Sequence, residues 1–336
     1  MSPKHLAFIE EIQDDLKATL LKALDYIQWE KHVQKDSVVF VKPNFTFPYY
    51  KEGITTDPVL LKCLLELLKS RADRVILGES DGGNHSFKAE DAFAGHDMYE
   101  ICREAGVELV NLSKLPSVYV EDKILSKNIK VQLPKLLLEE VDCFISVPVL
   151  KVHVMTTITL SMKNLWGCFP DTMRCFHHQG LDYKLPLITK CLKPKIVIID
   201  GIYALNNHGP IYGEAVPTNL IIASDNPVAA DALGTRIMGF SPAQIGHILV
   251  AEKAGLGSTK IENMQINNDW QHYRKDFYIK RTLLDNLSKL PFNSDLLAKI
   301  IYKSPLTSLV YKIVGLLRTQ QEKEAASQMK NQGGRK

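Results

Sequence analysis

The stretch Ser37-Val-Val-Phe-Val-Lys-Pro-Asn44 combines the two features that decide the fold. It begins as a short apolar run without polar alternation, which is typical of a strand that is covered on both faces. It ends in the polar loop Lys42-Pro43-Asn44, where the proline restricts the preceding residue to extended geometry. Five further runs have strand length, at residues 74–77, 107–110, 143–147, 195–199 and 219–223.

Helical patterns separate most of these runs. Asp57-Pro58 opens a leucine-rich pattern, and residues 88–105 form another. Asn226-Pro227 and Ser241-Pro242 each place a cap residue before a proline at the first helical position. Strands that alternate with helices predict an α/β fold, with a mainly parallel sheet and helices on both of its faces. Residues 113–135 break the alternation and predict a small antiparallel piece.

The composition limits both the class of protein and its compartment. The chain has 336 residues, 45% hydrophobic and 24% charged, so it can bury a core and is neither wholly disordered nor a disulfide-stapled miniprotein. A net charge of +3 is too small to indicate nucleic-acid binding. The six cysteines include no CxxC pair, and the first residues lead into an acidic helical pattern without an apolar signal core. We therefore expect a cytoplasmic protein.

The charge distribution predicts two parts. We expect an α/β domain at residues 1–258 that carries the site, followed by a basic helical extension at 259–336. This extension contains fourteen basic and seven acidic residues. An apolar stripe with basic flanks at 297–318 suits either packing on the domain or binding to an anionic membrane surface, which makes peripheral membrane association an alternative location. We expect a disordered tail from about residue 320, where the sequence becomes polar.

Polar loops follow most of the predicted strands directly. Ligands of open parallel sheets bind in the crevice outside the carboxyl ends of the strands, so these loops predict a shared pocket at one edge. After the first strand, Lys42 can meet an anion, and Asn44 offers a hydrogen-bond donor and an acceptor. After the second strand, the glycine-rich acidic loop at residues 78–83 supplies further candidates. These further candidates are Glu79 and Asp81 for proton transfer and Ser80 and Gly82 for ligand binding. A plain acidic turn is the alternative.

Residues 151–170 hold the densest group of candidates. Lys151 and His153 are two positions apart, so an extended backbone directs both to one face. Together with Lys163 and Asn164 they can clamp a carboxylate or phosphate beside a titratable imidazole. His153 and Lys163 are therefore candidate catalytic residues, and Lys151 and Asn164 are candidate ligand-binding residues. The alternative is a helix start with solvated lysines and a core tryptophan.

The loops after the last two strands complete the predicted site. They contribute the candidate ligand-binding residues Asp200, Asn207, Gly209 and Asp225. A metal site built from His153, His177, Asp200 and Asp225 is conceivable, but nothing in their spacing requires one. The cofactor is therefore left open.

Several of these blocks together resemble a known family. In chain order they are Lys42-Pro43-Asn44, Thr56-Asp57-Pro58, Gly78-Glu79-Ser80, Pro148 to His153, Lys163-Asn164 to Gly167, Asp200-Gly201, Gly209-Pro210-x-x-Gly213 and Asp225 to Asp231. Over residues 38–257 the chain resembles the domain of unknown function 362 family, an uncharacterised prokaryotic group. The resemblance implies association with iron–sulfur proteins. This chain departs from the members with ferredoxin-like cysteine clusters, so we expect no iron–sulfur cluster of its own.

Three functions are compatible with these patterns. The first is an enzyme that binds a small anionic metabolite, with lysine clamps and proton transfer by His153 and an acid. The second is a redox accessory protein that docks a separate iron–sulfur or flavin protein, as the resemblance implies. The third is a membrane-peripheral binding module that uses residues 297–318. The polar loops at one edge of the sheet favour the first.

Overall fold

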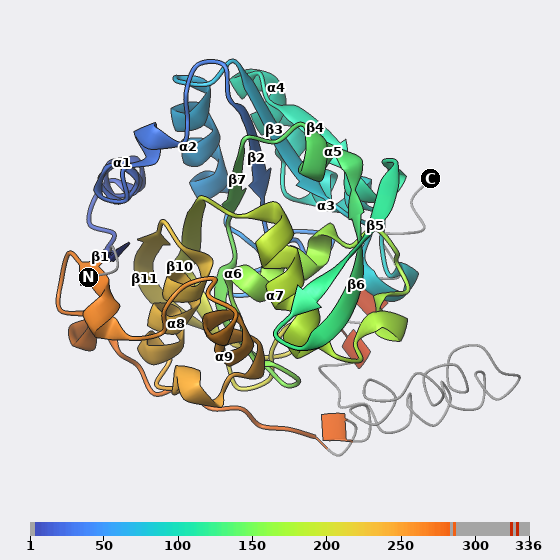
Figure 1. Cartoon of the computed structure of the whole chain (residues 1–336). Coiled ribbons are helices and arrows are strands. Elements are labelled where there is room, and N and C mark those ends of the chain that lie inside the picture. The colour runs from blue at the N-terminus through green and yellow to red at the C-terminus, as the bar shows by residue number, and fades with distance from the viewer. Residues whose placement is uncertain (1–3, 283–284, 287–322, 325–326, 329–336) are drawn as a thin grey trace, which may run out of the picture.

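The computed structural model of the chain describes residues 4–282, 285–286, 323–324 and 327–328. Its centre is an open sheet flanked by helices (Figure 1). The strands lie in the order β12 (Met264–Ile266), β1 (His5–Glu11), β11 (Glu214–Ser224), β10 (Ile196–Asn206), β7 (Cys143–Ser146), β2 (Val38–Lys42), β3 (Arg74–Glu79) and β4 (Glu108–Asn111). Strand β8 (Val149–His153) pairs with β10 and with β9 (Thr157–Thr159).

Five neighbouring strands, from β10 to β4, are mutually parallel. Their apolar runs are buried on both faces, as the lack of alternation predicts. In β2, Val39 and Val41 belong to one core, and Phe40 belongs to the core on the opposite face. The predicted α/β fold with a mainly parallel sheet is confirmed.

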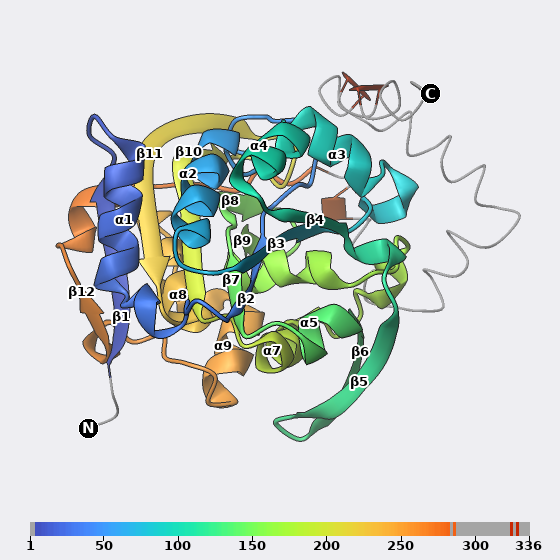
Figure 2. The same ribbon diagram turned by 90° about the horizontal axis from the view of Figure 1, so that it is seen from above.

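Helices cover both faces of the sheet (Figure 2). One face carries α1 (Leu16–Tyr26), α2 (Pro58–Lys69), α3 (Ala89–Gly95) and α4 (Met98–Ala105). The other face carries α5 (Lys135–Glu139), α7 (Leu181–Leu192), α8 (Pro227–Ile237) and α9 (Gly246–Lys253), together with the short α6 (Ser161–Asn164). Asp57 caps α2 and Asn226 caps α8, each before the proline that the sequence places at the first helical position.

Two local predictions have different outcomes. Residues 113–135 contain the antiparallel hairpin of β5 (Ser117–Ile124) and β6 (Lys127–Pro134), so the small antiparallel piece is confirmed. The helical pattern that we expected to follow the first residues is wrong at His5–Glu11, which forms β1 instead. This segment pairs with β11 more than 200 residues away, and that tertiary pairing overrides its local pattern.

The sheet continues beyond residue 258, where we expected the extension to begin. Strand β12 pairs in parallel with β1 and therefore adds an edge strand to the same sheet. The stripe at 297–318 lies outside the described residues, and so does most of the tail that we expected to be disordered. None of the helices in the described ranges is long and apolar enough to cross a membrane.

Candidate functional site

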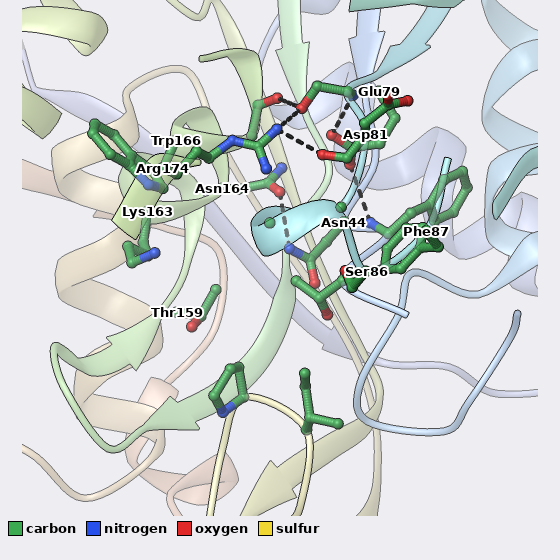
Figure 3. Close-up of a pocket in the computed structure, with 18 of the residues that line it drawn as sticks. Asn44, Glu79, Asp81, Ser86, Phe87, Thr159, Lys163, Asn164, Trp166 and Arg174 are labelled. Atoms are coloured by element: carbon green, nitrogen blue, oxygen red, sulfur yellow. Dashed lines mark hydrogen bonds between the residues drawn. The ribbon is translucent and has the colours of Figure 1, made fainter. Parts of the chain in front are cut away.

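A pocket of about 540 Å³ opens at the carboxyl ends of β2 and β3 (Figure 3). Its volume lies within the range of small-molecule sites. The lining residues come from the ends of β2 and β3 and the loops after them, from β8, β9 and α6, from the segment after α6, and from the loop between β10 and β11. They include Lys42, Asn44, Glu79, Ser80, Asp81, Gly82, His153, Thr159, Lys163, Asn164, Trp166, Gly167, Arg174 and Tyr212. Segments far apart in the sequence therefore meet at one edge of the sheet, as the polar loops predict.

Lys42 and Glu79 form a buried ion pair at the floor of the pocket. The Lys42 Nζ donates to a carboxylate oxygen of Glu79 and to the carbonyl oxygen of Pro43 at 2.6 Å. The Glu79 carboxylate also accepts hydrogen bonds from the backbone N–H groups of Phe45 and Ser80. Because each charge already has a partner, this pair fixes the ends of β2 and β3 and offers a ligand little free charge.

Gly167 is what allows this ion pair to fit under the pocket wall. A Cβ atom at Gly167 would lie 3.0 Å from Glu79 Oε1 and 3.0 Å from both the Cε and Nζ atoms of Lys42. The absence of a side chain lets the backbone at Gly167 approach the pair closely. The carbonyl oxygen of Gly167 also accepts a hydrogen bond from Ser80 Oγ.

Lys151 lies beneath the pocket and does not line it. Its ammonium is fully buried and donates to Asn44 Oδ1, to Thr46 Oγ1 at 3.1 Å and to the carbonyl oxygen of Ile54 at 2.6 Å. All three acceptors are neutral, and burial pushes the pKa of Lys151 well below its usual value. Lys151 therefore positions Asn44 and is not an anion clamp that reaches the ligand.

Asn44 and Asn164 continue the chain of hydrogen bonds that starts at Lys151. The Asn44 amide donates to Asn164 Oδ1 at 3.0 Å, and the Asn164 amide donates to the carbonyl oxygen of Lys42 at 3.1 Å. A second bond from Asn164 reaches Ser146 Oγ at 3.2 Å. These contacts connect β8, β2 and α6 across the pocket floor.

Of the two lysines that line the pocket in the described part of the chain, Lys163 is the one that remains free to meet a ligand. It extends from α6 into the pocket (Figure 3), and within the described ranges its ammonium makes no hydrogen bond or ion pair. Burial, and next the charge of Arg174, lowers the pKa of Lys163 to about 8. Asp231 of α8 holds the start of α6 by accepting from the backbone N–H groups of Ser161 at 2.7 Å and Met162 at 3.0 Å.

Arg174 is a buried cation that the sequence prediction missed. The side chain is 8% exposed and lines the pocket, and it pairs with no carboxylate in the part of the chain that the structure describes. Its Nε donates to the carbonyl oxygen of Phe169 at 3.0 Å, and its Nη2 donates to Ser80 Oγ and to the carbonyl oxygen of Asp81. Its Nη1 makes no hydrogen bond to the described residues. Two N–H donors thus remain available to a ligand.

His153 lines the pocket as a neutral ring. Its Nδ1 accepts a hydrogen bond from the backbone N–H of Met155 at 3.1 Å, so the ring proton is on Nε2. Burial, and next the charge of Lys163, lowers the pKa of His153 well below its usual value. The ring therefore presents an N–H group to the pocket, and its basic lone pair is occupied. Nearby, Thr159 Oγ1 is buried without a hydrogen-bond partner in the described residues.

Asp81 has a structural role that the sequence did not reveal. Its carboxylate accepts hydrogen bonds from the Ala89 backbone N–H at 2.9 Å, from Asn111 Nδ2 at 2.9 Å and from Lys88 Nζ at 3.3 Å. Burial alone would raise the pKa of Asp81, and these hydrogen bonds outweigh it and lower the pKa. Gly82 also lines the pocket, and a Cβ there would lie 2.5 Å from Ser86 Oγ, so this close approach requires a glycine. These contacts hold the loop after β3 in place.

Three further candidates, like Lys151, lie near the pocket without lining it. Asp200 accepts from the backbone N–H of Asp57 at 2.8 Å and so connects β10 to α2, while burial raises the pKa of Asp200 to about 7. Asn207 donates to Glu214 Oε1 at 3.0 Å within the β10–β11 hairpin. Gly209 lets that hairpin approach Val152, whose carbonyl oxygen would lie 1.8 Å from an added Cβ. These residues hold elements next to the pocket and do not line it.

Asp225 lies at the opposite edge of the sheet, so its predicted position in the crevice is wrong. Strand β11 runs antiparallel to β10, and Ser224 therefore pairs with Val197 near the start of β10. There Asp225 accepts a hydrogen bond from the backbone N–H of Leu6 at 3.1 Å. The sequence indicated a strand at 219–223 but not its direction. The metal site that included Asp225 also lacks support, since no group of three or more His, Cys, Asp or Glu residues in the described ranges could hold a metal ion.

The fold and the pocket place the chain among open α/β proteins whose crevice lies outside the carboxyl ends of parallel strands. The chain belongs to the family described as domain of unknown function (DUF362), whose model matches residues 39–236 and thus every residue that lines the pocket. It is also 34% identical over 130 residues to the thylakoid-associated protein sll1697 of Synechocystis sp.. That match covers 37% of this chain and 40% of the relative's length. No solved structure matches the chain.

Proposed function

We propose that this protein is an enzyme that binds a small anionic metabolite, a carboxylate or a phosphate, in the pocket between β2, β3 and α6. The observation that carries the proposal is the pair of cations on one wall, Lys163 and Arg174, neither of which pairs with a carboxylate in the described residues. An uncompensated buried charge is costly. A bound anion would supply the missing partner for both side chains.

The two cations suit different parts of this task. A guanidinium stays charged at every physiological pH and offers donors in a planar fork, so the free Nη1 of Arg174 suits a carboxylate or phosphate oxygen. Lys163 has a pKa of about 8, close to neutrality, which suits a group that gains and loses a proton during a reaction. His153 supplies a hydrogen-bond donor nearby. Glu79 and Asp81, which we expected to transfer protons, are held by their own partners.

Binding of simple anions tests the proposal directly. A native mass spectrum of the purified full-length protein should show a retained small molecule, and calorimetry should detect binding of pyruvate or inorganic phosphate. Arg174→Met and Lys163→Met should each weaken that binding by about tenfold or more, since a charged hydrogen bond is lost. Lys253→Met, at an exposed position on α9, is the matched control. Absence of a retained molecule together with no binding of either anion contradicts the proposal.

Membrane association is a second candidate function, and the thylakoid-associated relative favours it. The apolar stripe with basic flanks at 297–318 lies outside the described residues, so the supporting features are its sequence and the relative's description. Sedimentation with vesicles that contain phosphatidylserine tests this idea in the full chain and in a variant that lacks residues 297–336. Equal sedimentation of both forms would exclude a role for this segment.

A further inference from the structure

The surroundings of Lys163 are those of a lysine that reacts as an amine. Its Nζ makes no hydrogen bond or ion pair among the described residues, and the charge of Arg174, another cation that lines the pocket, acts on it. Its neighbours in the sequence, Met162, Leu165 and Trp166, are buried. A lysine that is desolvated beside another cation is the arrangement that activates an amine for attack on a carbonyl group.

Lys163 is also unlike the other lysines at the pocket. The ammonium of Lys42 is neutralised by Glu79, and that of Lys151 is saturated by three hydrogen bonds. Only a neutral amine can act as a nucleophile, and a lysine without a carboxylate partner loses its proton most readily. Among the lysines that contact the pocket floor or wall, Lys163 alone combines access with the absence of a described partner.

We propose that the pocket takes a 2-oxo carboxylate, whose carbonyl carbon forms an imine with Lys163 Nζ while Arg174 holds the carboxylate. This inference rests on the proposed function, because it specifies the anion and the role of the same wall. A 2-oxo acid carries its carboxylate one bond from the carbonyl carbon, so one compact molecule can engage two neighbouring side chains of this pocket. The pocket volume of about 540 Å³ leaves room for a substituent on the carbonyl carbon.

The step balances without an added oxidant or reductant. The lone pair of the neutral Lys163 amine forms a bond to the carbonyl carbon, and the π electrons of the carbonyl move to its oxygen. Both protons of the amine then leave with that oxygen as water, and a carbon–nitrogen double bond remains. We assign to the Nε2–H of His153, which also lines the pocket and whose Nδ1 is occupied by Met155, the hydrogen bond to this oxygen as charge develops on it.

Reductive trapping tests the imine. The full-length protein is incubated at pH 7 with sodium cyanoborohydride and either pyruvate or 2-oxoglutarate, and intact masses are measured. We expect one adduct, with the mass of the oxo acid less one oxygen atom, and peptide mapping should place it on Lys163. Excess lactate, which has the carboxylate but no carbonyl group, should reduce the trapping rate at least severalfold. The exposed Lys253 serves as an internal comparison and should stay unmodified.

Variants and binding measurements separate the possible failures. Lys163→Arg keeps a cation but has no nucleophilic amine, so it should give no adduct, whereas Lys253→Met should be trapped as well as the wild type. An adduct that maps elsewhere, or that persists in Lys163→Arg, overturns the inference. Calorimetric binding of pyruvate to the wild type without any trapping also overturns the imine and leaves the proposed function standing. Failure of both binding and trapping overturns both.

Discussion

Replacement of Lys163 by methionine should stabilise the protein while it removes a cation from the pocket. Burial and Arg174 lower the pKa of Lys163 from 10.5 to about 8. At pH 7 the side chain is charged in both states, and its charged form is less stable in the folded protein than in the unfolded chain. At about 1.4 kcal/mol for each pKa unit, the cost of this charge at pH 7 is about 3 kcal/mol. Methionine has a similar length and no charge, so Lys163→Met should raise the free energy of unfolding by up to about that amount.

The stability gained in Lys163→Met should depend on pH, because the pKa of Lys163 is lowered in the folded protein. The folded protein releases the Lys163 proton near pH 8, and the unfolded chain releases it near 10.5. Between these values the unfolded chain binds more protons, so the stability of the wild type rises with pH. The advantage of Lys163→Met should therefore fall from about 3 kcal/mol at pH 7 to about 1 kcal/mol at pH 9.5.

Urea unfolding at pH 7 and pH 9.5 measures the stability gained in Lys163→Met and how that gain depends on pH. The exposed Lys253→Met is the control, and its stability should stay within about 0.5 kcal/mol of the wild type at either pH. A Lys163→Met protein that is no more stable than the wild type at pH 7, or whose gain in stability is equal at the two pH values, would refute the argument that Lys163 is a half-buried amine without a partner among the described residues.

Three further predictions concern the walls and supports of the pocket. Arg174→Lys should weaken pyruvate binding by about tenfold in calorimetry, because a lysine keeps the charge and loses the planar fork of donors. Gly167→Ala should lower the free energy of unfolding in urea by about 1–3 kcal/mol, since its Cβ would lie 3.0 Å from both Lys42 and Glu79. Gly83→Ala is the control and should change stability little, because the nearest atom to its Cβ would be 3.9 Å away. Asp231→Asn should make stability less dependent on pH between 4 and 7. Burial raises the pKa of Asp231 to about 7, so the wild type loses stability as the pH rises through that window. Urea unfolding at pH 5 and pH 7.5 measures the difference, and an unchanged dependence on pH would contradict the prediction.

The sequence was sufficient to predict the parallel strands because their apolar runs are buried on both faces. The runs at β2, β3 and β7 read directly as strands, and the polar loops after β2 and β3 line one pocket. The direction of β11 could not be read in this way, because an apolar run looks the same in either direction and a hairpin replaces the expected crossover. Asp225 was misplaced for this reason.

The chemical roles of the candidate residues were harder to predict than their location. Whether a lysine is neutralised, saturated or free depends on partners that are distant in sequence, such as Glu79 for Lys42 and Ile54 for Lys151. Arg174 carries no local pattern that distinguishes it from a surface arginine, and only its burial against Ser80 and Phe169 reveals it. Local sequence therefore located the pocket, and tertiary contacts were needed to separate its free cations from its structural ones.

The hydrogen bonds that run from Lys151 through Asn44 to Asn164 have a consequence for how a ligand would be received. Each amide in this chain already has its oxygen and nitrogen assigned, because a lysine can only donate and the carbonyl oxygen of Lys42 can only accept. Neither amide can rotate by half a turn without breaking two bonds, so the dipoles beneath the pocket have one fixed orientation before anything enters. A ligand that matches this orientation is bound by dipoles that are already in place. Water molecules would have to reorient around the same ligand, and that cost is avoided here.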